Sequence, residues 1–192
     1  FVALSADAGT DSWLTVGYVD GFSGSDLMAS PGTPERLNFW TPDAGVTLTN
    51  DAVFRQPVNG ASGSVVIAQL TVQGTWSATL NAQGKNNDGT DWEARGIEFM
   101  RGAGGCGAGG TYADTDTVTT SVGANGVTYR LQATLTDAAS SLYAIHGTPE
   151  APMSLPPAYQ AAAPFGVDIG GVPPNFVALS ADAGTDSWLT VG

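Results

Sequence analysis

The sequence predicts an all-β protein: an antiparallel β-sandwich of about nine short strands, with a proline-rich extended strap near the C-terminus. Three observations indicate this fold. Only 12% of the residues are charged and a single lysine is present, which disfavours long helices. Short apolar stretches alternate with polar residues, as half-buried strands do. Glycine, proline and asparagine turn signals separate these stretches at regular intervals.

The strands are expected where such stretches occur. They cover residues 14–19, 37–40, 46–49, 52–54, 65–72, 75–81, 92–100, 115–122, 127–135 and 142–145. Residues 65–72 give the strongest signal, because a continuous apolar run that turns into alternation is typical of a central strand. Asn125-Gly126 predicts a tight hairpin, and a second hairpin is expected around Asn50-Asp51.

The remaining segments are predicted to lack strands. Residues 23–36 and 102–110 are rich in turn residues and predict loops, and residues 137–141 predict one helical turn. Residues 148–175 hold seven of the eleven prolines, so this strap is expected to be extended and to lie outside any sheet. Its apolar residues predict an ordered strap over the surface: Met153, Leu155, Tyr159, Phe165, Val167 and Ile169.

An internal repeat sets the expected organisation. Residues 176–192 repeat residues 1–17 letter for letter, which indicates either a tandem array with a period of 175 residues or an engineered duplication. We therefore expect a sandwich module at 1–147, the strap at 148–175, and a third segment at 176–192.

A sandwich has one place for the repeated strand, and we expect the copy at 1–17 to take it. The copy at 176–192 would then begin a neighbouring module or be donated to a second molecule, with a disordered tail as the alternative. The residues predicted to mediate assembly are apolar: Phe176, Val177, Leu179, Trp188, Leu189, Val191, Tyr159 and Phe165.

Charge and cysteine content exclude several functional classes. The net charge is −12 with six basic residues, which disfavours nucleic acids and anionic membrane surfaces as partners. No apolar run is long enough to span a membrane. The single cysteine, Cys106, excludes an intramolecular disulfide and a cysteine-based zinc site.

No convincing catalytic set is present, so the sequence predicts a protein that is not an enzyme. His146 is the only histidine, and we expect it at the end of a strand. Cys106 lies in a glycine loop whose one basic neighbour is Arg101, and we expect nothing there to lower the pKa of its thiol. Glu93 and Glu98 could serve a glycosidase. Their separation of five residues, however, places them on opposite faces of a regular strand, and only a bulge would bring them to one face.

Acidic loops and tryptophans leave a second function open, a calcium-dependent adhesive or carbohydrate-binding module of a cell-surface protein. Four aspartates could supply oxygen ligands for Ca²⁺, although their spacing matches no EF-hand: Asp88, Asp91, Asp114 and Asp116. Asp7 and Asp11, with their copies Asp182 and Asp186, are expected to form turns. The five tryptophans could stack on sugars, but Trp76 alternates with core-facing residues, so most are expected in the core.

Three groups of stretches resemble β-rich algal repeat proteins of the kind that includes diatom pyrenoid shell proteins. The stretches are residues 11–17; residues 65–72 with 81–84 and 91–92; and residues 142–145 with 156–160 and 164–166. The resemblance implies self-assembly into a sheet, shell or filament, and a plastid location. We therefore expect a structural repeat module whose partners are copies of itself, with no cofactor except an optional Ca²⁺.

Overall fold

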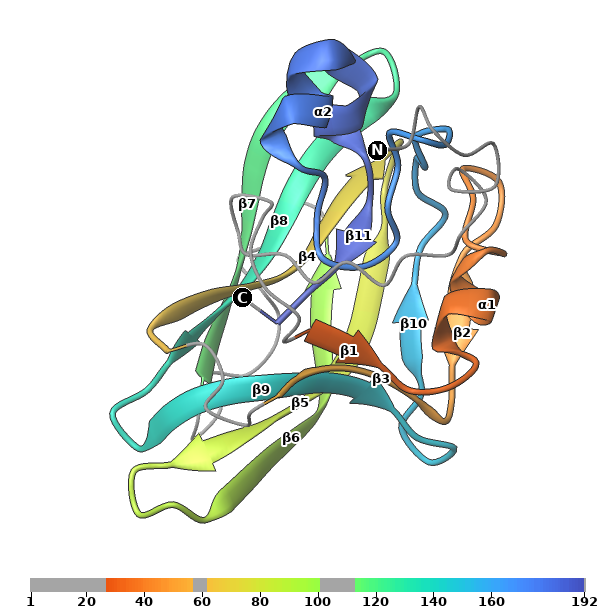
Figure 1. The fold of residues 1–192 in the computed structure, drawn as a ribbon. Coiled ribbons are helices and arrows are strands. Elements are labelled where there is room, and N and C mark those ends of the chain that lie inside the picture. The colour runs from red at the N-terminus through yellow and green to blue at the C-terminus, as the bar shows by residue number, and fades with distance from the viewer. Residues whose placement is uncertain (1–26, 57–61, 101–112, 192) are drawn as a thin grey trace, which may run out of the picture.

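The chain folds into two antiparallel β-sheets that pack face to face, which confirms the predicted all-β sandwich (Figure 1). The computed structural model describes residues 27–56, 62–100 and 113–191. The strand predicted at 14–19, the loop predicted at 102–110 and Cys106 lie outside these ranges.

The larger sheet has seven strands in the order β1-β3-β9-β5-β10-β2, with β6 also paired to β5. Its strands are β1 (Leu27–Ala29), β2 (Val46–Leu48), β3 (Asp51–Arg55), β5 (Ser77–Asn86), β6 (Asp91–Met100), β9 (Ala139–Gly147) and β10 (Met153–Leu155). The smaller sheet has the order β11-β4-β8-β7. Its strands are β4 (Ser64–Val72), β7 (Ala113–Gly123), β8 (Gly126–Leu135) and β11 (Trp188–Leu189). The helical elements are α1 (Thr33–Leu37), α2 (Pro174–Leu179) and a 3-10 helix, η3 (Ala181–Thr185).

The strongest sequence signals give the expected elements. β4 is buried from Val65 to Val72 and lies inside its sheet between β11 and β8, as its apolar run predicts. β7 and β8 form the predicted hairpin, in which Gly123 pairs with Gly126. Gly126 has a φ of 129°, a backbone conformation that residues with a side chain rarely adopt, which explains the glycine at this turn.

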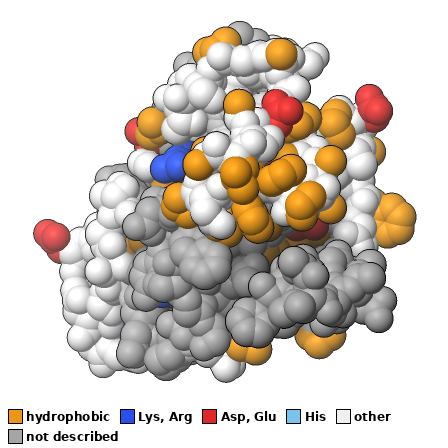
Figure 2. All heavy atoms as spheres, turned by 45° about the horizontal axis from the view of Figure 1, so that its top comes forward, with side chains coloured by type: hydrophobic (Ala, Val, Ile, Leu, Met, Phe, Trp, Pro, Cys, Tyr) orange, Lys and Arg blue, Asp and Glu red, His pale blue; other side chains and the backbone are white. Residues whose placement is uncertain are grey.

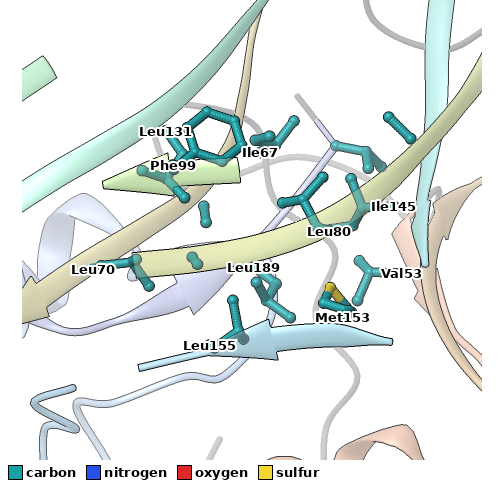
Figure 3. Packing of buried hydrophobic residues seen from close by; sticks show 14 of the residues in the cluster. Val53, Ile67, Leu70, Leu80, Phe99, Leu131, Ile145, Met153, Leu155 and Leu189 are labelled. Carbon is teal, nitrogen blue, oxygen red and sulfur yellow. The ribbon is translucent and has the colours of Figure 1, made fainter. Parts of the chain in front are cut away.

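The core lies between the sheets and draws on both. Figure 3 shows Leu70 of β4, Leu80 of β5 and Leu189 of β11 within one cluster. Four tryptophans are buried, as expected, while Trp13 lies outside the described residues: Trp40, Trp76, Trp92 and Trp188. The indole N–H of Trp40 donates to the carbonyl oxygen of Pro156 at 2.7 Å, so the strap is anchored to the core.

The segment from residue 23 to 54 differs from the prediction. A strand and a helix, β1 and α1, lie within the expected loop, and residues 37–40 end the helix instead of forming a strand. Pro34 in the first turn explains the helix, because its ring presets a helical φ. β2 and β3 are strands but form no hairpin, because β2 pairs with β10 and β3 pairs with β1 and β9.

The chain beyond residue 135 also differs. Residues 137–138 form a turn leading directly into β9, and the expected helical turn is absent from this stretch. The strap contributes β10 to the larger sheet, between β5 and β2, although we expected it to stay outside any sheet. Met153 and Leu155 face the core with exposed fractions of 0% and 2%, which explains why this stretch joins the sheet. The sandwich therefore extends beyond residue 147, where we had placed its boundary.

Candidate functional site

The C-terminal copy of the repeat completes the smaller sheet of its own molecule. β11 pairs antiparallel with the edge of β4, with Trp188 opposite Gln69 and Leu189 opposite Ala68. The backbone N–H of Thr190 donates to the carbonyl oxygen of Ile67 at 2.9 Å. This finding corrects our expectation that residues 176–192 leave the module because residues 1–17 take the place; residues 1–17 lie outside the described part of the chain.

The strap forms the other side of the place that holds β11. The backbone N–H of Leu189 donates to the main-chain carbonyl oxygen of Asp168 at 2.9 Å. The carbonyl oxygen of Leu189 accepts from the backbone N–H of Gly170 at 2.8 Å. Ile169 and Leu189 thus form a parallel bridge. We call residues 180–191 the closing segment, and we call the space that it fills between β4 residues 66–71 and strap residues 161–172 the acceptor groove.

Alternate side chains of the closing segment fill two separate apolar clusters. Leu189 and Val191 belong to the main core. Trp188 points to the opposite face, where it packs with Val66, Val172 and Ala183. All three side chains of the segment are at least 96% buried, and burying each contributes about 1.5–3 kcal/mol. The alternation also explains why the repeated stretch needs a large residue on each face.

A glycine in the strap makes room for the tryptophan. Gly171 has a φ of 91°, and a Cβ atom there would lie 3.3 Å from the Trp188 ring. The groove is therefore shaped to accept an indole at this position. Any larger residue at 171 would face both a strained backbone and a crowded ring.

Asp186 joins the closing segment to the strap. It is fully buried, and its two carboxylate oxygens accept from the backbone N–H groups of Ala161 at 2.8 Å and Val167 at 2.6 Å. Burial raises the pKa of this carboxyl to about 7, with the nearby Asp168 adding to the rise and the two N–H donors opposing it. We expected a turn-forming role for Asp186, whereas its side chain bridges two segments of the chain.

Two amide side chains hold the closing segment from the smaller sheet. Gln69 of β4 donates its Nε2 to the carbonyl oxygen of Asp186 at 2.7 Å. Asn125, at the tip of the β7–β8 hairpin, donates to Asp182 Oδ1 at 3.3 Å. The backbone N–H of Thr71 donates to the hydroxyl of Ser187 at 2.9 Å. These contacts recognise particular side chains as well as the main chain.

The other predicted assembly residues divide between interior and surface. Phe176 of α2 packs edge-on against Phe165 of the strap, with ring centroids 6.0 Å apart. Tyr159 of the strap is half-buried. Val177 and Leu179 of α2 are 40% and 74% exposed. Figure 2 shows hydrophobic side chains scattered over this end of the molecule, with only isolated charged ones among them.

A separate hollow of about 410 Å³ lies beside the strap. Its walls include Trp76, Asp43, Asn125 and Tyr159, together with Pro156 and Pro157. The indole N–H of Trp76 is buried and has no hydrogen-bond partner in the described part of the chain. Its ring lies 5.2 Å from that of Tyr129. An aromatic wall with amide, carboxylate and phenol groups around it has the chemistry of a site for a polar ligand.

The four aspartates predicted as calcium ligands belong to two different sheets. Asp88 accepts from the backbone N–H of Thr90 at 2.9 Å, which closes the turn before β6. Asp91 lies 2.8 Å from the amine of Lys85. Asp116 and Asp114 lie on β7, and the side chain of Asp114 is not among those described. Among the described residues, no group of three or more His, Cys, Asp or Glu side chains is arranged to hold a metal ion.

Glu93 and Glu98 share one face of the larger sheet, because β6 is not the regular strand that the prediction assumed and has the bulge that was its alternative. They lie opposite Gln83 and Thr79, which are four residues apart on β5, because β6 has an irregularity opposite Asn81. The buried Asn81 accepts from the N–H of Gly96 at 2.9 Å and so holds this irregularity in place.

The two glutamates are nevertheless poorly placed as a catalytic pair. The register places their Cα atoms four residue steps apart, about 13 Å along the sheet, and the carboxylate of Glu93 is already held by other side chains. Glu93 contacts Arg95 at 2.9 Å and the Nε2 of His146 at 3.0 Å. Arg95 and, more weakly, His146 lower the pKa of Glu93, which disfavours a role as general acid.

Comparison with known proteins adds no relative: no family model matches the chain, and no curated protein or solved structure is significantly similar to it. No helix in the described part of the chain is long and apolar enough to cross a membrane. The acceptor groove is therefore the site for which sequence and structure offer the most specific information.

Sequence reasoning missed this groove for a clear reason. A repeated sequence does not show at which residue the structural module begins. The copy that completes a module can therefore lie at the N-terminal or the C-terminal end of that module. The apolar residues at 188, 189 and 191 indicated burial, but their pattern could not show in which sheet they would lie.

Proposed function

We propose that this protein is a non-enzymatic structural module that builds a filament, sheet or shell through contacts between successive modules. The observation that carries the proposal is the identity between the closing segment and the start of the chain. The strand that completes one module has the sequence that leads into the next. Successive modules would therefore be joined by a strand of the sandwich itself.

The numbers of grooves and copies favour a tandem arrangement. The described residues form one acceptor groove, while the chain carries two copies of the segment that fits it. A chain of n successive modules would have n grooves and n + 1 copies, so only one copy per chain would lack a groove. Because a docked copy buries three large apolar side chains, the array is the arrangement that leaves the least apolar surface in water.

The connection between such modules is short. Only residues 18–26 separate the first copy from β1, which begins at Leu27. Ten residue steps, from 17 to 27, span at most about 36 Å when fully extended. A docked strand with so short a connection favours regular spacing of modules over a flexible string.

Electron microscopy and small-angle scattering of a chain with three successive modules would test the proposal. The chain would carry residues 1–17 followed by three copies of residues 18–192. We expect straight or evenly curved rods whose length grows by a constant increment per module. The matched control carries Trp188→Ala at the internal joints only, and it should lose regular spacing. Modules at variable distances and angles in both chains would refute the proposal.

The hollow beside Trp76 favours one alternative, a carbohydrate-binding adhesive module, with calcium dependence as a further possibility. Its aromatic wall is a feature that sugar sites use, and the buried indole N–H has no hydrogen-bond partner among the described residues. A glycan array and calorimetry with Ca²⁺ would test it, with Trp76→Phe as the variant that retains packing and removes the N–H. Absence of binding to glycans and to Ca²⁺ would remove this alternative.

A further inference from the structure

The acceptor groove contacts particular side chains of the strand that it binds, as well as its main chain. Main-chain bonds from Ile67 and Asp168 would accept many strands, but three other contacts require particular residues. The space above Gly171 fits an indole, the N–H groups of Ala161 and Val167 require a carboxylate or similar acceptor, and the N–H of Thr71 requires a hydroxyl. Together these contacts specify the sequence Asp-Ser-Trp. Apolar residues must follow at the two positions that face the core, which Leu189 and Val191 occupy.

That specification is met twice in the chain. Residues 186–191, which fill the groove, are matched by residues 11–16 in every position. The groove therefore cannot distinguish the copies by chemistry, and only their attachment differs. The groove of a given molecule holds one copy at a time, so the other copy can make the same contacts only in another groove.

We propose that the acceptor groove binds the first seventeen residues of a second copy of this chain, in the place that the closing segment takes in the structure. This inference rests on the proposed assembly function and names the joint through which it would occur. Docking runs head to tail, because the donor lies at the N-terminal end and the groove is closed from the C-terminal end. Such a joint extends into a line of molecules when its rotation does not close a ring.

The resident closing segment competes with the incoming copy. It is attached to the same module, so its effective concentration at the groove is high. When the first copy of one molecule replaces the resident segment of another, the number of filled grooves stays the same. The exchange therefore buries no additional apolar surface. We expect docking of the second copy where the resident segment is weakened, displaced or absent.

The test weakens the resident segment in the full chain and measures mass in solution. Trp188→Ala should shift the chain from monomer to dimer and larger species in sedimentation velocity, because residues 1–17 of another molecule now fit the groove better. Trp13→Ala is the matched control and should leave the monomer unchanged. The double variant should lose the shift. A monomeric Trp188→Ala chain with wild-type stability would show that the chain's own first copy takes the groove, and it would overturn the proposal.

A second measurement covers the case in which Trp188→Ala fails to fold. The wild-type chain is warmed to half-unfolding with a fluorescent peptide of residues 1–17, then cooled and separated by gel filtration. We expect peptide to be retained in the protein peak in proportion to its concentration. A peptide with Trp13→Ala should be retained about 30-fold less, the effect expected for losing one buried aromatic anchor.

The two outcomes also separate this inference from the proposed function. Retained peptide together with an irregular three-module chain would leave the groove valid and refute the array. A regular three-module rod with no retained peptide and no mass shift would overturn the groove as the joint. If neither peptide binding nor a mass shift is observed, the inference is wrong.

Discussion

Ionisation of Asp186 should control how firmly the closing segment is held. Its pKa lies at about 7 in the folded protein, whereas an aspartate in an unfolded chain titrates near 3.9. The folded state therefore keeps a proton that the unfolded state releases, and the contribution to stability is complete below about pH 4 and is lost as the pH rises to 7. The folded and unfolded pKa values differ by about 3 units, and each unit corresponds to about 1.4 kcal/mol, so the stability lost between pH 4 and pH 7 is roughly 4 kcal/mol.

Asp186→Asn tests this reasoning because an amide has a similar shape and does not ionise. One of the two backbone donors, from Ala161 and Val167, then loses its best acceptor, at a cost of about 1 kcal/mol at any pH. We expect the variant to be slightly less stable than the wild type at pH 4 and about 3 kcal/mol more stable at pH 8. Acid groups elsewhere affect both proteins alike.

Urea denaturation followed by tryptophan fluorescence at a series of pH values would measure the difference in unfolding free energy. Asp11→Asn changes the same residue in the other copy, and its difference from the wild type should not vary with pH. The reasoning would be refuted if Asp186→Asn lost more stability at pH 8 than at pH 4. That result would mean that the two N–H donors outweigh burial and keep the carboxylate charged.

The remaining predictions concern unfolding free energy and use the same denaturation assay. Leu189→Ala should destabilise the fold by about 2–5 kcal/mol because the side chain is fully buried, whereas Leu14→Ala should have little effect; equal effects of the two would contradict a groove filled by the C-terminal copy. Gly84→Ala should cost about 2–3 kcal/mol because a methyl group would overlap the neighbouring strand, and Gly123→Ala, which faces open space, should be tolerated; a neutral Gly84 variant would refute this packing. Asn81→Ala should cost about 2–4 kcal/mol because two carbonyl oxygens and one N–H lose a buried partner, and a loss below about 1 kcal/mol would show that water replaces the amide.

Features that depend on neighbouring residues could be predicted from the sequence. β4, β5 and the β7–β8 hairpin follow from alternation and from one Asn-Gly turn, because the pattern and the turn lie within the same short stretch. The burial of Trp76, Ala78 and Leu80 on one face follows from the same rule. These signals also suffice for the all-β class, since several such strands with short turns bury their apolar faces against one another in a sandwich or a barrel.

Features that depend on distant residues could not be predicted. β2 and β3 are separated by two residues, yet β10, about a hundred residues later, determines where β2 pairs. The shared face of Glu93 and Glu98 depends on an asparagine of the preceding strand. The role of Asp186 depends on two N–H groups of the strap, which carry no sequence signal. In each case the partner is specified by tertiary contact rather than by spacing.

The position of β11 at the end of the chain has a consequence for synthesis on the ribosome. β4 ends at Val72 and β11 begins at Trp188, so 116 residues must be added before the edge of β4 can be covered. At about 5–20 residues per second this takes roughly 6 to 23 s, during which an apolar strand edge is open to other chains. The first copy of the segment has the same sequence and leaves the ribosome before β4. The closing segment, which is made last, is the part of the chain that covers this edge in the folded module.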